Sequence, residues 1–274
     1  MSYINQRTIR KSVSIFGNGL HTGEKTSITL HPAQPDTGIV FIIEGIEIKA
    51  LASNVCDTSR GTTLEWGNVR IHTVEHLLSV FAGLLVDNVK IEVCGMEAPI
   101  MDGSALPFVQ LIDEAEIEEQ DAAPLIIAPA RPVWALDGGK CIYASPSDSY
   151  MVNMLISFEN KMIGEQALSV CIDPEIYRRE IAPARTFCTS DEIEYILSQG
   201  LGKGGTEDNV VVAYEDHFST PLRFNNEMVR HKILDLIGDL SLSGGRMRAD
   251  VFGLKTSHTL NTGLASSLHD AEVQ

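Results

Sequence analysis

The chain has 274 residues, 44% hydrophobic and 21% charged, which is a globular composition with room for two ordinary domains. Its formal net charge of −16 argues against binding to nucleic acids or anionic membranes, because both partners require a basic surface. Five widely spaced cysteines without a Cys-x-x-Cys pair, no signal-peptide core and no run of eighteen apolar residues predict a cytoplasmic protein without stable membrane insertion.

The first half begins as β-sheet. Polar and apolar residues alternate in runs at 12–16, 26–30 and 39–43, separated by turn residues, and this pattern predicts an antiparallel meander. The glycine-rich segment 17–23 has the flexibility of a phosphate-binding loop. Because no helix follows it with an N-terminus to offer, a plain turn is the favoured interpretation, and the spacing assigns it no chemistry.

A helix is predicted after Thr73, which suits an N-cap, because apolar residues recur at helical spacing from Val74 to Leu85. Glu75 and His76 lie off that apolar stripe. A carboxylate beside an imidazole in the first turn is consistent with a capped helix start or with catalysis, and the pattern leaves both open. This half ends with a strand at 88–93, a turn at 101–104 and a helix at about 105–114.

An acidic run at 113–121, followed by three prolines, indicates a solvated joint, and we predict domains of residues 1–123 and 124–274. The second half again begins with strands and ends with helix, strand and helix, at 132–136, 140–144, 150–158, 226–240, 248–253 and from Asn261. This repeated order predicts an α+β fold of two similar domains, each a mainly antiparallel sheet with two helices. We expect the helices to lie between the two sheets.

The first of these second-half helices has a polar face on which His231, Asp235 and Asp239 recur every four residues. An imidazole and a carboxylate one turn apart can bind one divalent cation, although a solvated polar face is the favoured interpretation of this spacing alone. If the duplication packs this helix against the one carrying His76, then His76, His231 and Asp235 form a three-ligand zinc set. Glu75 would lie beside it as a base, and a fourth position would be open to water.

An insert at about 188–213 interrupts the second domain. It contains a short amphipathic helix, with Ile193 on the apolar side, between two strand-like segments. Apolar surface on such an insert usually packs on the parent domain, and the alternative is that it lines a channel for an acyl chain.

Six segments, in this order along the chain, carry a resemblance to a known family: 19–23 (GLHTG), 72–77 (HTVEHL), 99–105 (PIMDGSA), 184–187 (ARTF), 230–239 (RHKILDLIGD) and 257–261 (SHTLN). From end to end the chain resembles the zinc-dependent UDP-3-O-acyl-N-acetylglucosamine deacetylases of lipid A biosynthesis. The resemblance implies two stacked α+β domains, one catalytic Zn²⁺ ion and a small-molecule substrate, an acylated UDP-amino sugar. It also implies a monomer in the cytoplasm of a Gram-negative bacterium.

The resemblance implies three zinc ligands, His76, His231 and Asp235. It makes Glu75 the general base, and it gives the Thr186 hydroxyl a part in stabilising the oxyanion. Protonated His258, oriented by Asp239, would donate a proton to the leaving amine. Asp239 would raise the pKa of His258 and keep this acid charged.

The resemblance further implies three substrate contacts. Lys232 is the candidate for a nucleotide-phosphate contact, with an exposed helix lysine as the alternative, and Phe187 would pack against the sugar. Ile193 would line a passage for the acyl chain, whose preferred length the sequence leaves open. Two other interpretations of the chain are a zinc amidohydrolase acting on a different N-acyl sugar and a non-catalytic binding protein with a structural metal.

Overall fold

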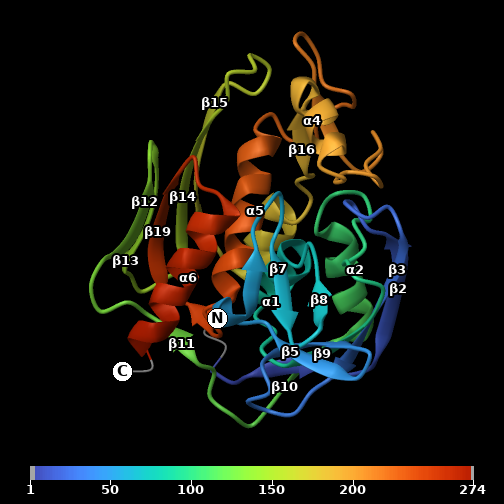
Figure 1. Ribbon diagram of the computed structural model, residues 1–274. Coiled ribbons are helices and arrows are strands. Elements are labelled where there is room, and N and C mark those ends of the chain that lie inside the picture. Colours follow the sequence, from blue (N-terminus) through green and yellow to red (C-terminus); the bar gives the residue numbers. More distant parts are fainter. Residues whose placement is uncertain (1–3, 273–274) are drawn as a thin grey trace.

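The computed structural model describes residues 4–272 and contains a five-stranded sheet in each half of the chain (Figure 1). The first sheet has the strand order β2 (Val13–Asn18), β3 (Lys25–Pro32), β9 (Val89–Cys94), β4 (Ile39–Ile43) and β5 (Ile46–Lys49). The second has the order β12 (Val133–Asp137), β13 (Lys140–Pro146), β19 (Ala249–Leu254), β14 (Met151–Ser157) and β15 (Glu165–Cys171). The two orders correspond strand by strand, so both halves share one topology.

The predicted antiparallel meander is wrong in its connections. β3 and β4 follow one another in the chain, but β9 lies between them, antiparallel to β3 and parallel to β4. β19 lies in the same way between β13 and β14. Alternation of polar and apolar residues identifies the buried face of a strand but not its neighbours, which is why the local pattern missed this insertion.

Helices lie between the two sheets, as expected, and Figure 1 shows them in this position. They are α1 (Glu75–Leu84), α2 (Leu106–Ala115), α5 (Glu227–Ser241) and α6 (His258–Glu272). α1 and α5 pack against each other, and nine of the ten residues of α1 are buried. A helix enclosed on all sides also buries its polar residues, so Glu75 and His76 lie inside the molecule.

Two helix starts differ from the expected ones. Val74, not Thr73, is the N-cap of α1, because the Thr73 hydroxyl donates to the buried Glu97 carboxylate (2.8 Å) instead of capping the helix. The C-terminal helix begins at His258, before the expected Asn261. There the Ser257 hydroxyl accepts a bond from the amide of Leu260 (3.4 Å), which satisfies one amide of the first turn.

Short strands lie on either side of the joint between the halves. β1 (Arg7–Ile9) pairs with β10 (Ile117–Glu119), and β11 (Ile126–Ile127) pairs with β18 (Arg246–Met247). Since β10 pairs back onto the first half and β11 onto the second, we propose residues 1–123 and 124–274 as the two domains. The first half also holds η1 (Ala52–Asn54) and a small sheet of β6 (Val55–Asp57), β7 (Thr63–Trp66) and β8 (Val69–Ile71).

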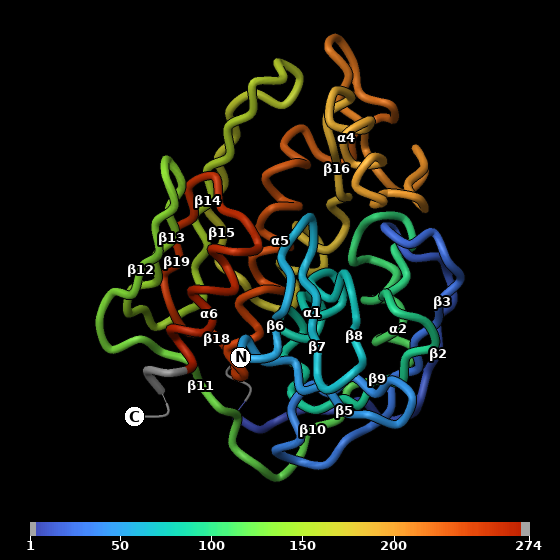
Figure 2. The backbone as a smooth tube through the Cα atoms, viewed as in Figure 1, coloured from blue at the N-terminus to red at the C-terminus, as the bar shows by residue number. Residues whose placement is uncertain are grey.

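The segment proposed as an insert lies near the N-terminal end of α5 (Figure 2). Its strands β16 (Phe187–Thr189) and β17 (Val211–Ala213) pair in parallel, with η3 (Ser190–Glu192) and α4 (Ile193–Ser198) between them. Two short helical turns, α3 (Pro174–Ile176) and η2 (Tyr177–Ile181), precede it.

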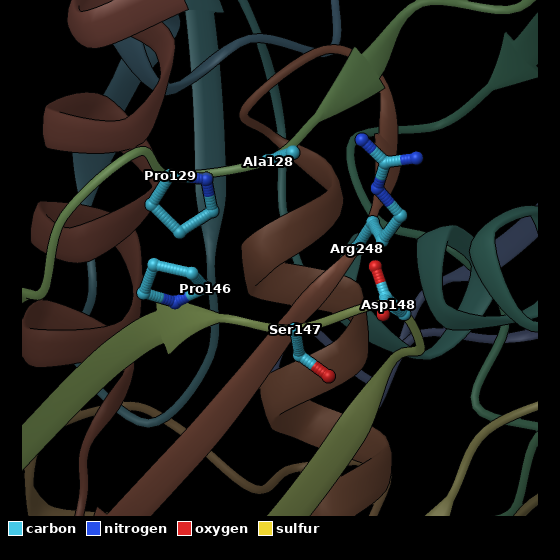
Figure 3. A pocket seen from close by; sticks show the side chains of 6 residues that line it. All are labelled: Ala128, Pro129, Pro146, Ser147, Asp148 and Arg248. Atoms are coloured by element: carbon cyan, nitrogen blue, oxygen red, sulfur yellow. The ribbon is translucent and has the colours of Figure 1, made fainter.

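A cavity of about 410 Å³ lies where the joint passes the end of β13, with Pro129, Pro146 and Arg248 among its lining residues (Figure 3). A larger one of about 750 Å³ lies between the halves and is lined by parts of α1, α5 and β18. None of the candidate site residues lines either cavity. Within residues 4–272, no helix combines the length and apolar character that a membrane span requires.

Candidate active site

α1 and α5 bring the three predicted metal ligands together from the two halves of the chain. His76 lies on α1, and His231 and Asp235 lie one turn apart on α5. Their ligand atoms all lie within 4.8 Å of one another. Asp235 Oδ1 is 3.3 Å from His231 Nε2 and 3.7 Å from His76 Nε2. The three side chains can therefore hold one metal ion.

The charges of this group suit a metal site. Burial lowers the pKa of His76 to about 3, with a further contribution from His231, and burial also lowers the pKa of His231. Burial opposes ionisation of Asp235, but Lys232 and His231 hold the pKa of its carboxyl well below its usual range. His231 Nδ1 is 3.1 Å from the Ala184 carbonyl oxygen, so Nδ1–H donates there and Nε2 keeps its lone pair. Two neutral imidazoles and a carboxylate fit zinc or a similar divalent ion.

Glu75 is the first residue of α1, beside His76, and is 3% exposed. Burial raises its pKa to about 7, although the nearby His258 opposes this shift. The Thr62 amide donates to Glu75 Oε2 (2.9 Å). α5 approaches closely at this point because Gly238 has no side chain; a Cβ there would lie 2.0 Å from the Glu75 carbonyl oxygen. A carboxyl group with a pKa near neutrality can act as a general base.

His258 forms an ion pair with Asp239 of α5, with 2.9 Å between Nδ1 and Oδ2. Burial alone would lower the pKa of His258, but Asp239 outweighs burial and raises the pKa to about 9. Asp239 is fully buried, and it also accepts hydrogen bonds from the Asn261 side-chain Nδ2 (2.9 Å) and the Thr62 hydroxyl (2.6 Å). His258 is therefore charged at neutral pH and can donate a proton.

The loop that carries Thr186 is held from both halves. The Thr186 amide donates to the Gly103 carbonyl oxygen (2.8 Å) of the first half. The preceding Arg185 makes a buried ion pair with Glu227, at the start of α5 (2.8 Å), and its amide donates to the same carboxylate (3.0 Å). The next residue, Phe187, lies edge to face with His231 at 6.2 Å between ring centroids. Thr186 and Phe187 thus sit on a fixed segment beside the metal group.

Lys232 and Ile193 lie in different surroundings. The Lys232 side chain is 18% exposed, and its Nζ donates to Asp235 Oδ2 (2.7 Å), so the alternative of an exposed helix lysine is wrong. Burial opposes the charge of Lys232, but Asp235 raises its pKa and keeps the ammonium protonated. Ile193 begins α4, which Figure 1 shows near the edge of the molecule, beyond the N-terminal end of α5.

Sequence reasoning missed several residues that hold the site in place, among them Thr62, Asn261, Glu97 and Glu227. Glu97 is buried and accepts bonds from the amides of His21 and Thr22 (both 2.9 Å), which fixes the glycine-rich segment 17–23 beside the start of α1. These residues act through contacts distant in sequence. No local spacing marks them, and their signal is the three-dimensional contact itself.

The site combines a group that can accept a proton, a group that can donate one and a cluster that can hold a metal ion, and these groups suit the hydrolysis of an amide. The protein is thus an amide hydrolase by class. A family model described as UDP-3-O-acyl N-acetylglycosamine deacetylase matches residues 6–270, so the chain belongs to this family. The resemblance noted in the sequence is confirmed.

Relatives described as UDP-3-O-acyl-N-acetylglucosamine deacetylases match nearly the whole chain. The UDP-3-O-acyl-N-acetylglucosamine deacetylase of Anaeromyxobacter sp. (strain Fw109-5) is 41% identical over 96% of this chain and 88% of its own. That of Myxococcus xanthus (strain DK1622) is 41% identical over 95% of this chain and 85% of its own. That of Saccharophagus degradans is 44% identical over 94% of this chain and 88% of its own.

Proposed function

We propose that this protein removes the acetyl group from UDP-3-O-(3-hydroxyacyl)-N-acetylglucosamine, a step of lipid A biosynthesis. Water cleaves the amide C–N bond. Its hydroxyl forms a bond to the acetyl carbon, which leaves as acetate, and a proton joins the nitrogen to give the free amine. The observation that carries the proposal is the arrangement of Glu75 and the His258–Asp239 pair around the His76, His231 and Asp235 group, in a chain of this family.

We propose zinc as the bound ion, held by His76, His231 and Asp235, because the donor types and their protonation states suit it. When bound, the ion supplies a Lewis acid that makes water more acidic and polarises the amide carbonyl. Glu75 then accepts the proton of the attacking water, and its raised pKa of about 7 allows this near neutrality.

His258 donates a proton to the departing nitrogen, and Asp239 holds the imidazolium in position for this transfer. The Thr186 hydroxyl donates a hydrogen bond to the oxyanion that develops on the acetyl oxygen. The fixed loop 184–187 supports this role, since a preorganised donor costs no rearrangement during the reaction.

For the substrate, we propose that Phe187 packs against the sugar and that Lys232 contacts a phosphate of the nucleotide. Ile193 would line the passage for the acyl chain within the insert at about 188–213. A preference for shorter acyl chains in Ile193→Trp, with no such change in Tyr195→Trp on the same helix, would support that passage. The monomeric state and the cytoplasmic location stay predictions of the sequence.

The deciding experiment measures acetate release from UDP-3-O-(3-hydroxyacyl)-N-acetylglucosamine by the purified protein, after chelation and after zinc is added back. We expect release to stop with chelator and to return with zinc. The same assay on UDP-N-acetylglucosamine, which lacks the acyl chain, tests specificity. Release from other N-acyl sugars but not from the acylated nucleotide would replace the proposed substrate.

A further inference from the structure

Thr62 lies between β6 and β7 and is fully buried. Its amide, its carbonyl oxygen and its hydroxyl all form hydrogen bonds at the site. Its amide donates to Glu75 Oε2 (2.9 Å), its carbonyl oxygen accepts from the amide of Val74 (3.2 Å), and its hydroxyl donates to Asp239 Oδ1 (2.6 Å). Glu75 belongs to the first half of the chain and Asp239 to the second. Thr62 therefore bridges the Glu75 carboxylate and the carboxylate that is paired with His258.

The Thr62 hydroxyl has a separate role from the other donors to Asp239. His258 Nδ1 and the side-chain Nδ2 of Asn261 both lie 2.9 Å from Asp239 Oδ2, whereas the Thr62 hydroxyl donates a hydrogen bond to Asp239 Oδ1. The carboxylate is fully buried, so bulk water does not reach Oδ1. Each oxygen of the Asp239 carboxylate thus has its own hydrogen-bond partners, and the partners of the two oxygens together fix the plane of the carboxylate.

We propose that Thr62 is a positioning residue for proton transfer: its amide holds the Glu75 carboxylate, and its hydroxyl holds the Asp239 carboxylate that orients His258. This inference rests on the proposed function, because it assigns Thr62 to the base and the acid named there. It adds a residue that touches neither the substrate nor the metal and acts through both carboxylates.

Removing only the hydroxyl has a defined electrostatic consequence. A hydrogen bond to a carboxylate is strongest when no cation shares the charge, so losing the Thr62 donor disfavours the state in which His258 is neutral. His258 then holds its proton more tightly and becomes a weaker acid. Asp239 and Asp235 of α5 and Glu75 of α1 are the acids facing it, and His21 and His76 are the nearby bases.

The test compares Thr62→Val, which removes the hydroxyl but keeps the shape and the amide, with Thr62→Ser, which keeps both donors. In Thr62→Val, we expect kcat to fall about 10–100-fold, KM to stay within about twofold and the alkaline limb of kcat to move up by about 0.5 pH unit. Thr62→Ser should stay within about threefold of wild type. The matched control is Thr63→Val, which removes the neighbouring hydroxyl, 2.9 Å from His72 Nδ1, and should retain wild-type turnover.

A second measurement needs no turnover: the NMR titration of the His258 ring in the zinc-loaded protein should move to higher pH in Thr62→Val. If that variant does not fold, Thr62→Ala takes its place. A folded variant with an unchanged His258 titration, or with lower kcat at an unmoved limb, overturns the proposal. Wild type and His258→Ala are assayed in parallel, because an inactive wild type or a fully active His258→Ala contradicts the proposed function instead.

Discussion

Glu75 and His76 are neighbours in one buried helical turn, and burial moves their pKa values in opposite directions. It raises the pKa of Glu75 to about 7 and lowers that of His76 to about 3. Burial disfavours the charged form of either residue, so it makes the carboxylate a better base and keeps the imidazole neutral. His258 is the exception, because Asp239 holds its charge. The surroundings thus give each group the protonation state that its proposed role requires.

Replacing Glu75 with Gln keeps the shape of the side chain and removes its basicity. We expect kcat to fall about 10²–10⁴-fold, the usual contribution of a general base. Bound zinc, measured by elemental analysis, should stay near one equivalent per chain, because the three ligands are unchanged. Turnover close to that of wild type would show that another group accepts the proton.

The pH dependence of activity should report His258. Its raised pKa means that the acid is protonated below about pH 9 and is lost as the pH rises through that value, so activity should fall on that side. Asp239→Asn removes the charge that raises this pKa, and the alkaline limb should then move down toward the ordinary value of 6.5. A pH–rate profile of kcat/KM for each protein measures the position of its alkaline limb. An alkaline limb that is the same in both proteins would count against His258 as the acid.

The contact between α1 and α5 depends on the backbone of one helix reaching that of the other. Gly238 permits this approach at Glu75. Gly83 of α1 instead makes room for η2, since a Cβ at Gly83 would lie 2.3 Å from the ring of Tyr177. At Gly238, the two helices that carry the proposed catalytic groups are therefore closer together than ordinary side chains allow. Their spacing determines whether His76 reaches His231 and Asp235.

A methyl group at residue 238 should separate the two helices. Alanine normally stabilises a helix relative to glycine by about 1 kcal/mol. Gly238→Ala therefore sets this gain in helix propensity against the steric overlap of the added Cβ. We expect it to destabilise the protein by about 1–3 kcal/mol and to weaken zinc binding, because its Cβ overlaps the Glu75 carbonyl.

The control for this prediction is Gly263→Ala in α6; apart from its two chain neighbours and the adjoining backbone of α6, none of the described residues has an atom within 4 Å of the added Cβ. It should leave stability unchanged or raise it slightly. Denaturant unfolding and zinc titration of both variants decide the matter. A Gly238→Ala protein as stable and as tightly metal-bound as wild type would disprove the close contact.

The elements show which parts of this molecule a sequence can predict. Helical spacing identified α1 and α5 and the residues on their polar faces, because that signal is local. The position of β9 between β3 and β4 could not be predicted, since strand neighbours are determined by contacts far apart in the chain. Thr62 and Asn261 were missed for the same reason: each contacts Asp239 from a distant segment.

At the scale of the whole molecule, the metal group joins the two halves. His76 comes from the first half, and His231 and Asp235 from the second. An ion bound by all three links the halves in the folded state, and the ligands are dispersed when the chain unfolds. Metal binding should therefore contribute to the stability of the entire protein and not only to its activity.

Removing the metal should lower the melting temperature. An ion at 100 times its Kd stabilises the folded state by about 2.7 kcal/mol, which for a chain of this size corresponds to roughly 5 °C or more. Calorimetry with chelator and with added zinc measures the difference. His76→Ala should abolish most of the zinc-dependent shift, and a shift of the same size in that variant would place the ion elsewhere.

The central position of β9 and β19 has a consequence for biosynthesis. In each half, the strand that completes the middle of the sheet is translated after the helix that carries proposed metal ligands, α1 before β9 and α5 before β19. In the nascent chain, the middle of each sheet therefore stays incomplete until this strand has been translated: β3 and β4 wait for β9, and β13 and β14 wait for β19. In the second half, α6 follows β19 in the chain. A chain released before β19 lacks the central strand of its second sheet. We expect such a partial product not to hold His76, His231 and Asp235 together, although it contains all three.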